Sequence, residues 1–159
     1  VISILQAGSI GKISQNDKSK TQFEIKGDKT AERVFKDVSR NTNVEWARIK
    51  HSTTKESNNT IVNQHDDENV SAAAKVALNF QKSGQNVSLL EHSHPLPDDF
   101  QNLPTFNLIM PPSGQNGESG DISTAKLFPN TIQRVFNLMT NRYEYYDKNG
   151  VYKTESAGD

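Results

Sequence analysis

The feature that most constrains the fold is a repeated switch between helical and strand periodicity along the chain. Residues 29–40 and 69–83 place apolar side chains at the i, i+3, i+4 and i+7 spacing of an amphipathic helix. Residues 44–51 alternate in polarity, which predicts a strand, and residues 86–94 are predicted as a further strand that ends before a proline. A chain with this order is expected to pack helices against a sheet.

The remaining segments complete a predicted α/β (α+β) fold with a mixed, mostly antiparallel β-sheet flanked by helices. Residues 1–28 contain short strand-like runs punctuated by glycine, and we expect them to form an N-terminal arm or linker. Residues 29–154 are expected to form the main domain. The other predicted elements are a weaker strand at 59–65, a long loop at 95–118, a short helix at 119–128 and strands at 131–140, 142–146 and 151–153.

Composition and charge exclude several classes of function. The 159 residues carry 18 basic and 19 acidic side chains, and the net charge of -1 argues against a broad surface for nucleic acid. No apolar run approaches the roughly 20 residues that cross a bilayer, so no membrane span is expected. Because the chain begins with Val1, we expect a piece of a longer polypeptide, and the sequence leaves its compartment open.

The sequence contains no cysteine and only four histidines. Disulfides, thiolate nucleophiles and zinc sites built on cysteine are therefore excluded. The zinc deaminases need a P-C-x-x-C run and are excluded for the same reason. The H-E-x-x-H motif of the zincins is also absent from the sequence. A metal-dependent nuclease would lack a basic face for phosphate.

Two of the four histidines lie in the run His92-Ser93-His94-Pro95. In a strand, residues i and i+2 project from the same face, so both imidazoles can reach one cation. A catalytic zinc needs a third protein ligand, which in a chain without cysteine must be His, Asp or Glu. Asp121, at the predicted start of the short helix, is the best-placed candidate. Its alternative role is that of an ordinary acid favoured at a helix N-terminus.

A hydrolytic zinc site also needs a general base, and a carboxylate that contacts the attacking water fits this role. Glu45 shares a strand face with Ala47 and Ile49, so its carboxylate is expected to point inward. A buried carboxylate is costly unless it has a partner or a function.

Together, these residues resemble the pattern of the JAMM (JAB/MPN) zinc metalloprotease family, which is an upstream Glu, then His-x-His-Pro, then Ser-x-x-Asp. The resemblance implies a JAB/MPN-like fold and zinc-dependent hydrolysis of peptide or isopeptide bonds in a protein or peptide substrate. It implies that His92, His94 and Asp121 bind Zn²⁺. It also implies that Glu45 is the general acid/base and that Ser119 helps to stabilise the oxyanion.

A narrower resemblance comes from the run NTNVEW around Glu45 and from the C-terminal run YYDKNGVYK. Both are similar to JAB-like domains at the ends of bacterial polymorphic toxins. This resemblance implies a toxin domain that is secreted as part of a larger bacterial protein. It further implies an immunity protein as a partner.

Two departures from the family pattern are visible. About ten residues commonly separate the second His from the Asp, whereas 26 separate His94 from Asp121, and such an insertion can be looped out because closure costs grow slowly with loop length. Ser119 lies two residues before Asp121 rather than three. The second departure favours an alternative function, a catalytically silent JAMM-like module that binds protein. An intact Glu45 favours the enzyme.

Two other polar features receive structural interpretations. The cluster HDDE at residues 65–68 precedes a predicted helix, where first-turn acids are favoured by the helix dipole. His51 is expected at the surface end of a strand.

Overall fold

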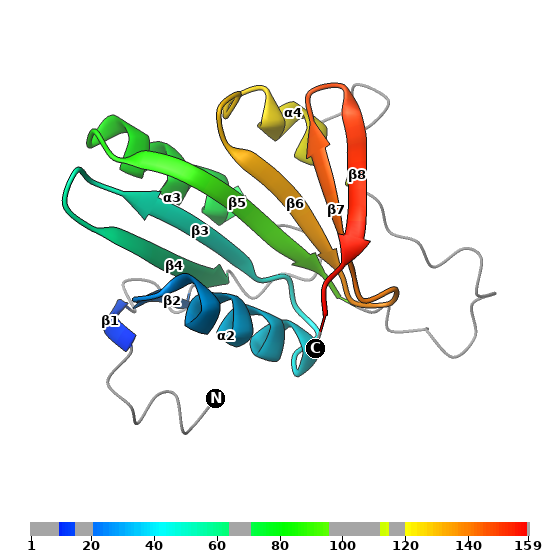
Figure 1. The fold of residues 1–159 in the computed structure, drawn as a ribbon, viewed down its shortest axis with the longest axis horizontal. Coiled ribbons are helices and arrows are strands. Elements are labelled where there is room, and N and C mark those ends of the chain that lie inside the picture. Colours follow the sequence, from blue (N-terminus) through cyan, green and yellow to red (C-terminus); the bar gives the residue numbers. More distant parts are fainter. Residues whose placement is uncertain (1–9, 15–20, 64–70, 96–111, 115–119, 159) are drawn as a thin grey trace.

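The computed structural model of the protein describes residues 10–14, 21–63, 71–95, 112–114 and 120–158 (Figure 1). These residues form eight strands and three helices. In chain order they are β1 (Ile10–Ser14), β2 (Thr21–Ile25), α2 (Asp28–Arg40), β3 (Ala47–Ser52), β4 (Ser57–Asn63), α3 (Ser71–Lys82), β5 (Asn86–His94), α4 (Asp121–Ala125), β6 (Ile132–Asn137), β7 (Arg142–Asp147) and β8 (Gly150–Ser156).

All eight strands belong to one sheet with the order β1-β2-β4-β3-β5-β6-β7-β8. Neighbouring strands are antiparallel except for β5 and β6, which run parallel. The sheet is therefore mixed and mostly antiparallel, and the predicted α+β fold class is confirmed. The parallel pair requires a crossover between its strands, and α4 lies on that crossover.

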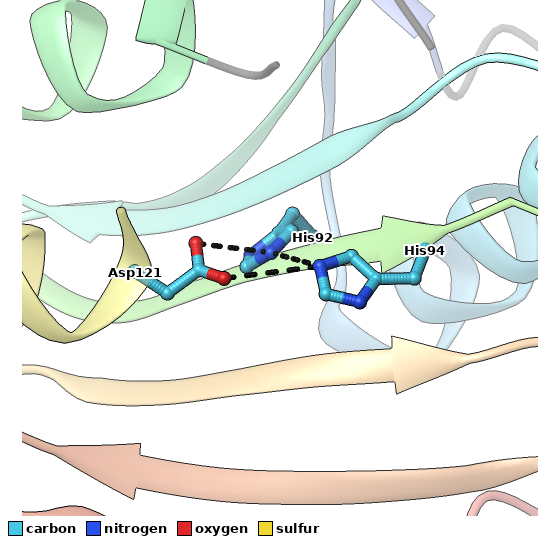
Figure 2. Close-up of side chains that lie close together, drawn as sticks. All are labelled: His92, His94 and Asp121. Carbon is cyan, nitrogen blue, oxygen red and sulfur yellow. Dashed lines mark hydrogen bonds and ion pairs between the residues drawn. The ribbon is translucent and has the colours of Figure 1, made fainter. Parts of the chain in front are cut away.

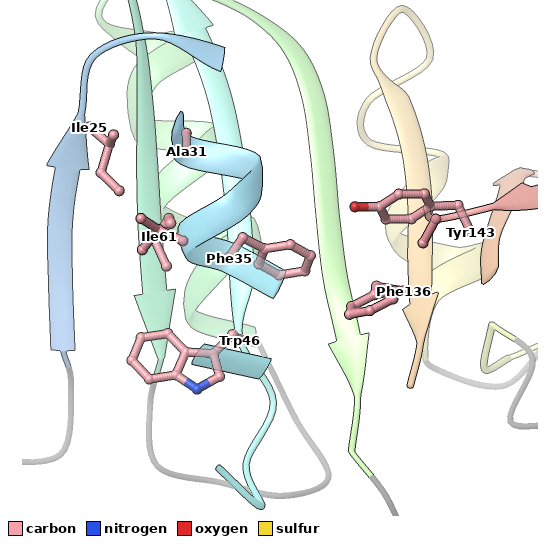
Figure 3. Close-up of a cluster of buried hydrophobic side chains, with 9 residues drawn as sticks. Ile25, Ala31, Phe35, Trp46, Ile61, Phe136 and Tyr143 are labelled. Atoms are coloured by element: carbon pink, nitrogen blue, oxygen red, sulfur yellow. The ribbon is translucent and has the colours of Figure 1, made fainter. Parts of the chain in front are cut away.

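Helices cover both faces of the sheet, with α2 on one face and α3 and α4 on the other (Figure 1). On the first face, Phe35 of α2 packs near Phe136 of β6, with ring centroids 6.1 Å apart, and Trp46 belongs to the same cluster (Figure 3). On the second face, the small residues of α3 pack against β3 and β5. Ala77 of α3 and Leu90 of β5 belong to one buried cluster there. The central strands are thus buried on both sides.

The segment predicted as an N-terminal arm contributes strands to this sheet. β2 pairs with β4 over its whole length, and Ile25 at its end is fully buried in the cluster beneath α2. The division of the chain into residues 1–28 and 29–154 stays a prediction, and the structure adds that β2 extends the sheet of the main domain.

His51 lies in the interior, so its predicted surface position is wrong. The side chain is 4% exposed and stacks on Phe80 of α3, with ring centroids 3.7 Å apart. Its two ring nitrogens lie within hydrogen-bond distance of Gln85 Oε1 and Thr60 Oγ1. The reason is that β3 lies between β4 and β5, where α3 covers this face.

None of the helices in the described ranges is long and apolar enough to cross a membrane. Three sequence features lie outside the described residues: Ser119, the whole HDDE cluster at 65–68, and the greater part of the predicted loop at 95–118.

Candidate metal centre

The two histidines of the HSHP run occupy the last part of β5. His92 and His94 are two residues apart in this strand and project toward the face that carries α3 and α4. Both are buried, and their Nε2 atoms lie 3.1 Å apart (Figure 2). Tyr146 of β7 supports the first ring, edge to face, with centroids 6.3 Å apart. The strand thus presents two imidazole nitrogens to one point.

Asp121 is the first residue of α4, and its carboxylate faces the same point (Figure 2). Its Oδ1 lies 3.2 Å from His92 Nε2, and its Oδ2 lies 3.8 Å from His94 Nε2. The helix is held over the sheet because Ile122 and Ala125 pack in a cluster with Val135 and Tyr146. Val135 is the partner of His92 in the parallel β5–β6 pair, so this packing brings the helix start beside the histidine.

Ser113, which belongs to none of the sequence motifs, holds Asp121 in place. The Ser113 backbone N–H and hydroxyl donate to Asp121 Oδ2 over 2.8 and 3.0 Å. In return, the Asp121 N–H donates to Ser113 Oγ over 3.1 Å, and the Ile122 N–H donates to the Ser113 carbonyl over 3.1 Å. A Cβ on Gly120 would lie 2.6 Å from Ser113 Oγ, so the close approach requires glycine there. The only sequence signal of this contact is the turn-like run PPSG.

Glu45, two residues before β3, completes the cluster. Its side chain is buried, and Oε1 lies 3.9 Å from His94 Nε2. The next residue but one, Ala47, is the ladder partner of His92, which explains why Glu45 and the two histidines meet although 46 residues lie between Glu45 and His92 in sequence. The predicted inward orientation of this carboxylate agrees with its burial.

The charges in the cluster act strongly on one another. Burial by itself lowers the pKa of His92, but the Asp121 carboxylate, assisted by Glu45, outweighs it and raises the pKa to about 9. Burial raises the pKa of Asp121, but His92 and the Ser113 hydrogen bond hold it well below its usual range. Burial raises the pKa of the Tyr146 hydroxyl far above its ordinary value, and the nearby carboxylates act in the same direction. Tyr146 is therefore neutral.

His92, His94 and Asp121 could hold a metal ion. Their ligand atoms all lie within 4.8 Å of one another. In a tetrahedral zinc site with bonds of about 2.0–2.1 Å, ligand atoms lie about 3.3 Å apart. The separations of 3.1, 3.2 and 3.8 Å lie around this value. Two imidazoles and one carboxylate are donors that suit zinc and leave a fourth position for water.

The fold and the cluster define an α+β domain with a buried His-His-Asp group that can accept a metal. A family model described as JAB-like toxin 1 matches residues 23–126, which include all three of these residues and Glu45. The chain belongs to this family of JAB-like toxins. Searches of the curated proteins and of the solved structures found no match.

Proposed function

We propose that the protein is a zinc-dependent hydrolase of amide bonds, peptide or isopeptide, and that it acts as a toxin on a protein or peptide substrate. The observation that carries the proposal is the convergence of His92, His94 and Asp121 on one point with the Glu45 carboxylate beside it. Membership of a family of JAB-like toxins supports the same function.

The charge balance of the site supports a divalent cation. Glu45 and Asp121 bring two carboxylates beside His92 and His94 in a largely buried cluster. With neutral imidazoles, the charge of Zn²⁺ would balance the two carboxylates. Buried charges are retained where such compensation exists.

Each residue then has a distinct role in the proposed mechanism. His92, His94 and Asp121 would hold the zinc, which when bound would lower the pKa of a water and polarise the carbonyl of the scissile amide. Glu45 accepts a proton from the water that attacks the carbonyl carbon. It delivers this proton to the amine nitrogen as the C–N bond breaks. Ser119 keeps its proposed role as a donor to the oxyanion.

Metal analysis is the first test. The purified protein is expected to bind one equivalent of zinc, and Asp121→Asn is expected to lose it. Stoichiometric zinc measured by elemental analysis in the parent but not in Asp121→Asn supports the site. A parent protein that fails to take up zinc after dialysis against it overturns the assignment.

The second test separates the enzyme from a silent binding module. Glu45→Gln is expected to retain zinc and to lose cleavage of a proteome-derived peptide library, followed by mass spectrometry of new termini. It should also lose toxicity on expression in a bacterial host. Glu56→Gln makes the same chemical change in the exposed β3–β4 turn and is the matched control. A library left uncleaved by the zinc-loaded parent, together with equal toxicity of parent and Glu45→Gln, would favour the binding module.

A further inference from the structure

The start of β3 departs from a regular ladder at the residue that follows Glu45. In an antiparallel pair, two facing residues exchange two backbone hydrogen bonds. The Ser93 N–H donates to the Trp46 carbonyl over 2.8 Å, as expected for such a pair. The Trp46 N–H, however, donates to the Ser93 side-chain Oγ over 3.0 Å. The strand proper begins one residue later, at Ala47.

The same peptide group is held from its other side. The carbonyl of Glu45 accepts a hydrogen bond of 2.7 Å from Asn63 Nδ2, at the end of β4. The carbonyl oxygen of Glu45 and the N–H of Trp46 belong to one planar peptide unit. Both of its polar atoms are therefore bound by buried side chains, one from each strand that flanks β3.

The two side chains that bind this peptide are completely buried, each with 0% exposure. Neither Asn63 nor Ser93 belongs to the group that could hold the metal, and Ser93 projects from β5 with the parity opposite to that of His92 and His94. Asn63 Nδ2 and Ser93 Oγ both bind the backbone next to Glu45.

The peptide orientation sets the direction in which the side chain of Glu45 leaves the backbone. The plane of the peptide between Glu45 and Trp46 sets the ψ angle of Glu45 and so the direction of its Cα–Cβ bond. The indole of Trp46 is fixed as well, since its Nε1 donates to Thr42 Oγ1 over 2.7 Å. A general base must be held to a fraction of an ångström, because a misplacement of about 1 Å can cost about 100-fold in rate.

From these contacts we infer that Asn63 and Ser93 are positioning residues for Glu45, which they hold through the peptide group that joins it to Trp46. The inference rests on the proposed function, in which Glu45 is the general acid/base. It adds a role for the central serine of the HSHP run: its two histidine neighbours face the metal, and the serine hydroxyl fixes the base.

The test uses Ser93→Ala and Asn63→Leu, which remove the two contacts one at a time. Each is expected to lower kcat on a peptide identified in the library by about 10- to 100-fold, since the base is misplaced. Zinc affinity, measured by competition with a chelator, is expected to be unchanged. Ser93→Thr keeps a hydroxyl and is expected to restore kcat.

A structural readout accompanies turnover. Trp46 is the single tryptophan of the chain, so its backbone amide can be followed by selective ¹⁵N labelling. Hydrogen exchange at this amide is expected to be faster in Ser93→Ala and close to the parent rate in Ser93→Thr. Ser88→Ala is the matched control, because Ser88 lies on the same strand and its hydroxyl contacts the Lys50 carbonyl of β3 away from the site.

The outcomes separate this inference from the proposed function. If Glu45→Gln retains full turnover, the proposed function fails. If Glu45→Gln is inactive while Ser93→Ala and Asn63→Leu keep parental kcat, or if they lose zinc affinity as strongly as turnover, the positioning role is overturned. In the Glu45→Gln background, Ser93→Ala should lower any residual turnover no further, since both changes act through one group. Additive losses would contradict the inference.

Discussion

The two faces of β5 differ in how their buried carboxylates are paired. On the α2 face, Glu91 is completely buried, and its two carboxylate oxygens accept hydrogen bonds from Arg48 and Arg134. Arg134 in turn pairs with Glu32 of α2 over 3.2 Å and lies over the ring of Tyr143. The four charged groups sum to zero, and the chain neutralises itself on this face.

On the other face, one residue along, the carboxylates meet imidazoles. Asp121 pairs with His92 and His94, and Glu45 pairs with His94. An imidazole can be neutral or protonated, so the charge balance on this face depends on what is bound there. The comparison teaches that the arginine network stabilises the fold, whereas the histidine cluster can exchange a proton for a metal ion.

The largest expected effect comes from breaking the arginine network. Glu91→Gln leaves Arg48 and Arg134 in the interior without the buried carboxylate that they share. The free energy of unfolding is expected to fall by about 3–5 kcal/mol, measured by urea denaturation with Trp46 fluorescence. Glu155→Gln, at the exposed end of the same network, is the control. If Glu91→Gln lowers the free energy of unfolding no more than Glu155→Gln does, buried charge on the α2 face contributes no more to stability than an exposed pair.

Metal binding at the histidine face of β5 should stabilise the fold without involving the arginine network on the α2 face. Zinc at about 100 times its Kd is expected to raise the free energy of unfolding by about 2.7 kcal/mol. Asp121→Asn should abolish this increase, because it removes one of the three proposed ligands, and Glu45→Gln should preserve it. The measurement is urea unfolding with and without zinc. An increase that survives in Asp121→Asn would place the metal elsewhere.

Loss of the Ser113 contacts should weaken metal binding while sparing the fold. Ser113→Ala removes the hydroxyl that donates to Asp121 and accepts from it, and the expected loss in zinc affinity is about 10- to 100-fold. Chelator competition measures this loss. Ser123→Ala, in the same helix, removes a hydroxyl that bonds to Gly120 and is expected to leave zinc affinity unchanged. Equal losses in both variants would assign the effect to the helix as a whole.

The smallest effect is expected for an exposed ion pair. Asp28 pairs with Lys50, and their side chains are 50% and 32% exposed. Asp28→Asn is expected to change the free energy of unfolding by less than about 1 kcal/mol, because water screens the pair. Thermal unfolding at low and high salt measures it. If Asp28→Asn lowers the free energy of unfolding as much as Glu91→Gln does, burial does not explain how much an ion pair contributes to stability in this protein.

Much of the site could be predicted from sequence because it follows strand periodicity. The i, i+2 spacing of His92 and His94 predicts a common face, and the alternation around Glu45 predicts an inward carboxylate. Both are local properties of a strand. The fold class could be predicted for the same reason, since long periodic segments carry the helices and strands.

What could not be predicted depends on contacts between distant segments. Ser113 reaches Asp121 across the glycine-rich run GQNGESG, where no periodicity indicates a partner. Arg48 and Glu91 occupy central strands covered on both faces, so alternation alone cannot assign them to water or to the interior. The surface position predicted for His51 is wrong for the same reason, because burial of a strand end depends on which helix covers it.

The Ser113 contact also has a consequence for changes in chain length. Because Ser113 and Asp121 are joined directly, the position of Asp121 beside His92 and His94 is held by contacts on both sides of residues 115–119 and does not depend on the number of residues between Pro95 and Pro112. For a flexible connection, a doubling of length costs about 0.6 kcal/mol. Insertions between Pro95 and Pro112 are therefore expected to leave the arrangement of His92, His94 and Asp121 unchanged.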